Sequence, residues 1–370
     1  MNFEFSDEQN LLRDQASSFL ADKSDLKVAR AILDGDTPYD ADLWREVVAL
    51  GWTATAIPEK FGGLGLGHLE LCVLAEELGR ALSPIPFSSS VYLATEALLQ
   101  FGSPAQQEAN LSNLAEGGAI GCLAVAEGPG ALKADRLGTT LAGGKLSGTK
   151  IMVADGDVAD LAVVLANSDS GPQLCLADLT GGGVSRQAMD TIDPTRSHSR
   201  ITFDGAAAEP LGEGGDGMTA LGRLFDRAAV LFAFEQVGGS QAALEMAREY
   251  AMGRYAFGRP IAGYQAIKHK LARMYVATTL ARSNSYYGAW ALSTDAPELG
   301  VAAATARVSA TQAYRECAEE NIQTHGGMGF TWEFDCHLYY RRAKLLSVNL
   351  GSEGVWKEKL ISRLEAERAA

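Results

Sequence analysis

The sequence lacks an excess of positive charge. It has 370 residues, with 32 lysines and arginines against 46 aspartates and glutamates, and its formal net charge is −14. Nucleic-acid binding and adhesion to anionic membranes both need clustered positive charge. These two classes of function are therefore disfavoured as general roles. An anionic ligand is still compatible with the composition, because a local basic pocket can form in an acidic protein.

Long apolar runs and cysteine pairs are missing as well. No run of about 18 apolar residues occurs, and the first residues, MNFEFSDEQNLLRD, are acidic, so we expect neither a membrane span nor a signal peptide. Five cysteines are scattered without a CxxC pair. That pattern is typical of a protein whose thiols stay reduced. We expect a cytoplasmic protein.

Signatures of several other chemistries are also absent. The five histidines show no metal-ligand spacing such as HExxH, so no metal site is expected. No Gly-x-Ser-x-Gly elbow occurs, which disfavours serine-hydrolase chemistry. We also find no internal repeat and no low-complexity tract.

The periodicity of the chain changes twice. Residues 1–115 carry apolar residues mainly at helical spacing, whereas residues 116–215 hold short β-like runs separated by Gly-, Asp- and Ser-rich turns. Residues 216–370 return to helical spacing, with long helices expected at about 217–253, 264–292, 297–324 and 353–367. The predicted fold is α+β. It has an N-terminal helical domain, a middle antiparallel β-barrel or sandwich, and a C-terminal four-helix bundle.

Three glycine-containing motifs carry possible chemistry. PEKFGGLGLG begins at Pro58, RYAFGRPI begins at Arg254 and is followed by Gln265, and QTHGGMGF begins at Gln323. Arginine offers a planar set of donors that suits a pyrophosphate. Glycine pairs allow backbone N–H groups to approach a dinucleotide closely. Taken alone, such motifs are more often a surface arginine and a simple turn.

In this order and spacing, the three motifs resemble signatures of the acyl-CoA dehydrogenase family, and the resemblance covers nearly the whole chain. It implies that FAD lies between the β domain and the C-terminal bundle, with its ADP half reaching into a neighbouring subunit. It further implies an acyl-CoA substrate, an electron-transfer flavoprotein as acceptor, and a homo- or hetero-oligomer. The residues that it implies for contact with the neighbour's FAD are Arg254, Phe257, Gln265, Gln323, Gly326 and Gly327.

The usual catalytic carboxylate of the family is missing. The family reaction removes an α-proton with a carboxylate base while a hydride leaves Cβ for the flavin. In most members a glutamate precedes Gly-Thr at the position that Leu350 holds here, before Gly351. In some members the base instead lies early in the first long C-terminal helix, at the position of Ala228. Neither side chain can accept a proton.

Glu235 is the substitute that the sequence offers. It stands in the apolar run VLFAFEQV, seven residues after Ala228, and therefore two turns further along nearly the same helix face. Desolvation in such a run would disfavour its charged form, which suits a base acting near neutral pH. The alternative is that Glu235 pairs with an arginine or satisfies a buried polar group. Glu353 and Asp226 are lesser candidates for the base.

The flavin-facing positions of the β domain also differ from the family. The family often has Thr-Glu-Pro where this chain has AEG, and Trp-Ile-Thr where it has MVA. Ala126 and Ala154 therefore replace threonines that donate hydrogen bonds near the reactive end of the flavin. Main-chain N–H groups could still serve in their place.

Both departures resemble a bacterial branch of the family that acts on bulky CoA thioesters, including steroid side-chain and ring fragments. Some of these enzymes are α2β2 heterotetramers in which one type of subunit carries the base. Our leading hypothesis is FAD-dependent α,β-dehydrogenation of a bulky acyl-CoA, with Glu235 as the base. One alternative is a base-less, non-catalytic partner subunit of a heterotetramer. Another is a flavin oxidase or monooxygenase on the same fold.

Overall fold

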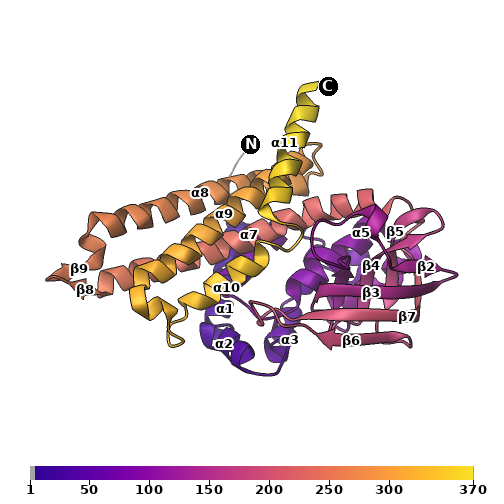
Figure 1. The fold of residues 1–370 in the computed structure, drawn as a ribbon, viewed down its shortest axis with the longest axis horizontal. Coiled ribbons are helices and arrows are strands. Elements are labelled where there is room, and N and C mark those ends of the chain that lie inside the picture. The colour runs from indigo at the N-terminus through magenta and orange to yellow at the C-terminus, as the bar shows by residue number, and fades with distance from the viewer. Residues whose placement is uncertain (1–4, 370) are drawn as a thin grey trace. The chain divides into compact units, whose positions relative to one another are not determined.

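The protein forms two compact units in the computed structural model, which describes residues 5–369 (Figure 1). The first, here called the helical unit, contains the described residues up to Ala31, together with His68–Ser83 and everything from Ala229 onward. The second, here called the β unit, contains Ile32–Gly67 and Pro84–Ala228. The N-terminal helical segment thus contributes to both units.

The helical unit begins with α1 (Asp7–Lys23), whose start is set by a capping box. Ser6 accepts a hydrogen bond from the backbone of Gln9, and the Gln9 side chain accepts one from the backbone of Ser6. α1 packs against α4 (His68–Arg80), which is buried along most of its length. α2 (Leu26–Asp34) follows α1 after a short turn.

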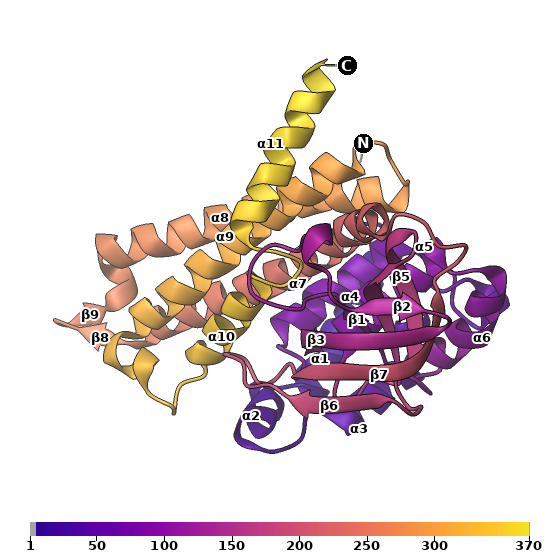
Figure 2. The same ribbon diagram turned by 45° about the vertical axis from the view of Figure 1, so that its right-hand side comes forward.

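The C-terminal bundle consists of long helices that lie alongside one another (Figures 1 and 2). They are α7 (Gly217–Gly253), α8 (Gln265–Ser293) and α9 (Leu299–His325), with α11 (Glu353–Ala369) packed on α9. Small side chains at the contacts let the helices approach closely, and they share a core cluster of Ala233, Val237, Ala281, Ala306, Ala310 and Ala313. In the described part of the chain, no helix has both the length and the apolar character needed to cross a membrane.

One further helix of this unit, α10 (Cys336–Leu346), was not expected from the sequence. Its buried face includes Leu338, Leu345 and the guanidinium of Arg342, which is 1% exposed. A hydrophobic pattern counts an arginine as a surface residue, so the face was not recognised. Between α7 and α8 the chain forms a hairpin of β8 (Tyr255–Ala256) and β9 (Arg259–Pro260).

The β unit is built on a seven-stranded sheet that closes on itself. Its strands are β1 (Gly121–Ala124), β2 (Thr140–Ala142), β3 (Lys145–Ala154), β4 (Leu161–Ser168), β5 (Gly171–Asp178), β6 (Val184–Ala188) and β7 (His198–Pro210). β4, β2, β3, β7 and β5 pair in a ring, because β5 also pairs with β4. The expected fold class is confirmed. The sheet is not wholly antiparallel, since β1 and β2 each pair with β4 in parallel.

The β unit also contains helices. They are α3 (Ala41–Ala49), α5 (Glu96–Phe101), α6 (Pro104–Ala115) and the π-helix η3 (Ser88–Thr95), which is buried throughout and packs on β1. The loop that carries PEKFGGLGLG turns tightly. A Cβ atom added at Gly63 would lie 2.0 Å from the carbonyl oxygen of Ile57, so only glycine fits there.

Candidate functional site

The first C-terminal motif lies on the β8–β9 hairpin at one end of the bundle (Figure 1). The hairpin is held by a hydrogen bond from the Tyr264 hydroxyl to the Ala256 carbonyl (2.8 Å) and by the Arg259 guanidinium, 4.0 Å from the Tyr264 ring centroid. At its tip Phe257 has a φ of 50° and is 99% exposed. The hairpin therefore presents an aromatic side chain outward on a fixed backbone.

The second motif lies at the same end of the bundle, where α9 stops. The ring of His325 stacks on Tyr250 of α7, with 4.1 Å between the ring centroids, and the Tyr250 carbonyl accepts a hydrogen bond from the Arg254 N–H at 2.8 Å. Tyr250 therefore links the second motif to the helix turn that precedes the first. Burial lowers the pKa of His325, while its hydrogen bond with the Asn321 carbonyl opposes that change. The next residue, Gly326, has a φ of 62°, and open space surrounds both Gly326 and Gly327. Backbone groups there can be approached closely from outside.

This end of the bundle has the chemistry that the ADP half of FAD requires. Arg254 and Gln265 are exposed, and α8 begins at Gln265 without a capping side chain on its N-terminal N–H groups. A long helix N-terminus and an arginine together suit a pyrophosphate. The two motifs also carry exposed aromatic and apolar side chains, which include Tyr255, Phe257, Met328 and Phe330. The residues present thus fit a dinucleotide bound with the help of a second subunit.

Glu235 lies in α7 with its side chain fully buried. An added Cβ at Gly79 of α4 would come within 2.0 Å of the Glu235 carbonyl oxygen, so the two helices touch here. The Glu235 carboxylate forms an ion pair with Arg342 of α10 at 3.5 Å, and Arg342 also donates to the Leu82 carbonyl at 3.5 Å. The arginine partner that the sequence left as an alternative is therefore present.

Leu350, at the usual base position of the family, lies in a clamped segment after α10. The buried guanidinium of Arg307 donates to the carbonyl of Asn349 at 2.9 Å and to its side-chain oxygen at 2.5 Å. Arg307 also donates to Gln236 of α7 at 2.8 Å, next to Glu235. Burial lowers the pKa of Arg307 to about 9. Leu350 itself has a φ of 58°, so the backbone of this turn is strained, and the side chain at its strained position is aliphatic.

The other two carboxylates considered as a base, Glu353 and Asp226, are an ion-paired and a buried side chain. Glu353, at the start of α11, forms ion pairs with Arg315 at 2.7 Å and with Lys357 at 2.6 Å. In the β unit, Ala228 and Asp226 are both buried. The assignment of Glu235 as base remains a prediction, as does the assignment of each cofactor-contacting residue.

In the β unit, the segments that carry Ala126 and Ala154 are joined by a hydrogen bond from the Ile151 N–H to the Ala126 carbonyl (2.8 Å). Beside it, the buried Lys150 ammonium donates to Glu127 at 2.7 Å. Burial alone would raise the pKa of Glu127, but hydrogen bonds from Lys150 and from the segment at Thr139 lower this pKa to about 2. Burial lowers the pKa of Lys150. The sequence alone does not indicate this ion pair, because its two residues are 23 positions apart.

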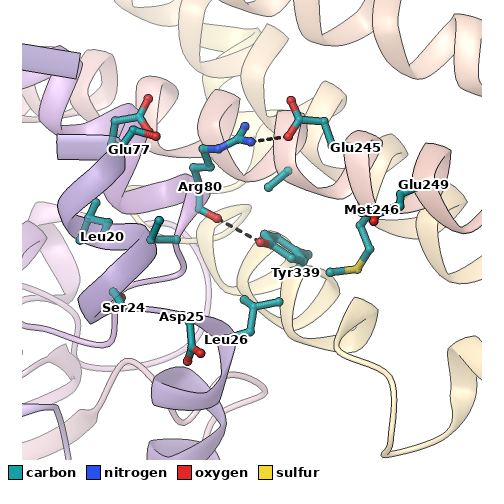
Figure 3. Close-up of a pocket in the computed structure, with 14 residues that line it drawn as sticks. Leu20, Ser24, Asp25, Leu26, Glu77, Arg80, Glu245, Met246, Glu249 and Tyr339 are labelled. Atoms are coloured by element: carbon teal, nitrogen blue, oxygen red, sulfur yellow. Dashed lines mark hydrogen bonds and ion pairs between the residues drawn. The ribbon is translucent and has the colours of Figure 1, made fainter. Parts of the chain in front are cut away.

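A cavity of about 380 Å³ opens inside the helical unit between α1, α4, α7 and α10 (Figure 3). Within it Arg80 pairs with Glu245, and the Tyr339 hydroxyl donates to the Arg80 carbonyl at 3.0 Å. Glu77 and Glu249 also line it. The lining carries more negative than positive charge, so it disfavours the phosphates of a CoA ester. This cavity is not a plausible acyl-CoA site.

Two family models match the chain. The model described as acyl-CoA dehydrogenase, N-terminal domain, matches residues 6–118, and the one described as acyl-CoA dehydrogenase, C-terminal domain, matches residues 215–364. Together they cover the helical segments on both sides of the barrel.

Similar proteins extend this match over the full length. The acyl-CoA dehydrogenase IpdE2 of Mycobacterium tuberculosis is 34% identical over 364 residues, which are 98% of this chain and 97% of that protein. The ChsE4–ChsE5 complex of the same organism matches at 28% identity, with a TM-score of 0.89 over 99% of each chain. A structure described as the Tcur3481–Tcur3483 steroid ACAD matches at 29% identity and a TM-score of 0.89, over 98% of this chain and 99% of that one. The chain therefore belongs to the acyl-CoA dehydrogenase family, whose members are oxidoreductases acting on CH–CH groups.

Proposed function

We propose that this protein takes part in the α,β-dehydrogenation of a bulky acyl-CoA with FAD as cofactor. The observation that carries the proposal is the link between the two motifs at one end of the bundle, where Tyr250 stacks on His325 and its carbonyl accepts a hydrogen bond from the Arg254 N–H. The preference for a bulky acyl group is supported by the relatives, one of which is described as a steroid acyl-CoA dehydrogenase. The substrate would be a CoA thioester of steroid-like or branched shape.

Each predicted contact has a role in this proposal. Arg254 and the N-terminal N–H groups of α8 from Gln265 would hold the pyrophosphate of a neighbouring subunit's FAD. Gln323 and the open backbone at Gly326 and Gly327 would approach the same dinucleotide, and Phe257 would cover it. Bound FAD supplies the hydride acceptor. In the β unit, the main chain at Ala126 and Ala154 would face the flavin ring.

Within this chain, Glu235 is the carboxylate that we propose as base. Its pair with Arg342 at 3.5 Å argues for a second candidate function. In that second case the chain is a base-less partner subunit, and a different chain supplies both the carboxylate and the rest of the catalytic site. The aliphatic residues at both usual base positions, Leu350 and Ala228, favour this arrangement. One relative is described as a complex of two different chains.

The visible absorption spectrum of the purified chain separates the two cases. About one FAD per chain, followed by bleaching when a steroid-side-chain CoA ester is added without oxygen, supports a self-sufficient dehydrogenase. A colourless chain that gains flavin only when co-expressed with a related chain supports the partner role. Absence of flavin under both conditions contradicts the proposed function.

The electron acceptor is tested with the same preparation. We propose an electron-transfer flavoprotein, so the reduced flavin should be reoxidised slowly by air and rapidly by that acceptor. Fast reoxidation by oxygen would instead indicate an oxidase or monooxygenase. All five cysteines are buried and free, which fits our expectation of a reducing, cytoplasmic location.

A further inference from the structure

A buried polar cluster lies directly after Ala154 in the β unit. At its centre is Asp155, which is 2% exposed. One oxygen of its carboxylate accepts a hydrogen bond from the Ser89 hydroxyl at 2.5 Å, and the other accepts one from the Ser197 hydroxyl at 3.3 Å. Arg196, also buried, donates to Ser88 at 2.6 Å. The cluster therefore ties the end of β3 to the π-helix η3 and to the turn before β7.

Such a cluster is costly to bury and so calls for a physical reason. Burial raises the pKa of Asp155, and the nearby Arg196 opposes that rise. The backbone of Asp155 is strained as well, with a φ of 53°, and its N–H donates to the Ser197 carbonyl at 2.9 Å. The π-helix that supplies Ser88 and Ser89 is an uncommon element that is often found at functional sites.

The cluster lies two residues after a bulge in the pairing of β3 with β7. The pairing of β3 with β7 shifts register between Lys150 and Val153, and Met152 has a φ of 51°. The bulge begins at Ile151, whose N–H donates to the Ala126 carbonyl, and Val153 and Ala154 pair again with Ser199 and His198 of β7. Residues 152–154 therefore lie between the bulge and the Asp155 cluster. Ala126 and Ala154 bring no hydroxyl groups, so main-chain N–H groups are the donors that this segment can offer.

We propose that Asp155 is a positioning residue that fixes the main chain of residues 152–154, so that its N–H groups take the place of the missing threonine hydroxyls toward the flavin ring. The inference rests on the proposed function, because the location of the flavin beside Ala154 follows from the family. Asp155 itself acts through the backbone and the Ser89 hydroxyl. It exchanges no proton with the substrate.

The test compares Asp155→Ala with Asp155→Asn in the flavin-containing protein, with the partner chain present if flavin binding needs one. Asparagine keeps a side-chain oxygen and tolerates a left-handed backbone, whereas alanine does neither. We expect Asp155→Ala to raise the Kd for FAD about tenfold, the equivalent of one hydrogen bond, and to shift the visible band and the flavin midpoint potential. Asp155→Asn should restore the Kd to within about threefold.

Matched variants separate positioning from general stability. Asp157→Asn alters a carboxylate that also accepts from Ser197, at 2.6 Å, and should leave the Kd and the potential unchanged. If Asp155→Ala does not fold, Ser89→Ala removes the π-helix donor alone and should change the same two quantities in the same direction. A wild-type Kd and spectrum in Asp155→Ala, or in Ser89→Ala if it takes its place, overturns the inference and leaves the proposed function intact. A wild-type protein that never binds FAD overturns both.

Discussion

Replacing Glu235 with glutamine should destabilise the protein by about 3 kcal/mol. The carboxylate and the Arg342 guanidinium are 3.5 Å apart, and both side chains are almost fully buried. At an effective dielectric constant of about 20, the attraction at this distance is about 5 kcal/mol. Glutamine has nearly the same shape and retains an oxygen acceptor, which we estimate to preserve about 1–2 kcal/mol. The remainder agrees with the loss of about 3–5 kcal/mol that follows the breaking of buried pairs.

The assay is equilibrium unfolding in denaturant, with Glu353→Gln as a control. Glu353 also forms ion pairs, with Arg315 and Lys357, but these partners are about half exposed. Its replacement should cost less than about 1 kcal/mol. Combining Glu235→Gln with Arg342→Met should recover part of the lost stability, because the unpaired charge is then removed. Equal losses for Glu235→Gln and Glu353→Gln would refute the reasoning about burial.

Activity of the same variant then decides between the two functions. If Glu235 is the base, a folded, flavin-containing Glu235→Gln protein should lose at least about 100-fold in turnover, as expected for a general base. If the chain is a base-less partner subunit, turnover of the complex should scale with the amount of folded protein. A folded variant with unchanged turnover would therefore rule out Glu235 as the base.

Three further predictions follow from the site. Leu350→Glu places a carboxylate at the usual base position of the family, and a chain that binds its own FAD should gain at least about tenfold in anaerobic flavin bleaching by acyl-CoA, whereas no gain would count against an acyl site beside residue 350 of this chain. Arg254→Gln should lower FAD retention at least about tenfold. Arg259→Gln alters only the stack on the hairpin and should retain FAD. Equal retention in both variants would contradict the pyrophosphate role of Arg254. The third concerns Glu127, whose pKa falls from 4.5 to about 2 on folding, so that its stabilising effect is complete above about pH 4.5 and is lost as the pH falls toward 2. Acid unfolding curves should therefore be steeper for the wild type than for Glu127→Gln, and parallel curves would contradict this assignment.

The long helices could be predicted because their periodicity is carried by many residues. The expected ranges 264–292 and 297–324 differ from α8 (Gln265–Ser293) and α9 (Leu299–His325) by no more than a residue or two at each end. Several short elements could not be predicted, because their hydrophobic pattern is weak or is contradicted by a buried polar residue. β2 and β6 are only three and five residues long and largely exposed, and the π-helix begins with three serines. α10 buries an arginine, which runs against the hydrophobic pattern.

In the candidate site, features formed by neighbouring residues could be predicted from the sequence, and contacts between distant residues could not. The glycine and arginine motifs could be identified because their chemistry lies within a few consecutive residues. The surroundings of Glu235 could not, because its neighbours along the helix are apolar while its ionic partner comes from α10. The same holds for Lys150 and Arg307, whose partners come from other segments of the chain. A charged residue within an apolar run indicates that Glu235 has a buried partner, but it does not identify which residue that partner is.

Arg307 links these observations into one argument about the catalytic centre. Its guanidinium binds both the segment that ends at Asn349, just before Leu350, and Gln236, which neighbours Glu235. The segment that carries the base in most family members is therefore built and held here, at the cost of burying a charge. A chain that only needed to fill space would not require such a clamp. We predict that this geometry shapes the acyl site, and that the proton acceptor is either Glu235 or a carboxylate of a second subunit.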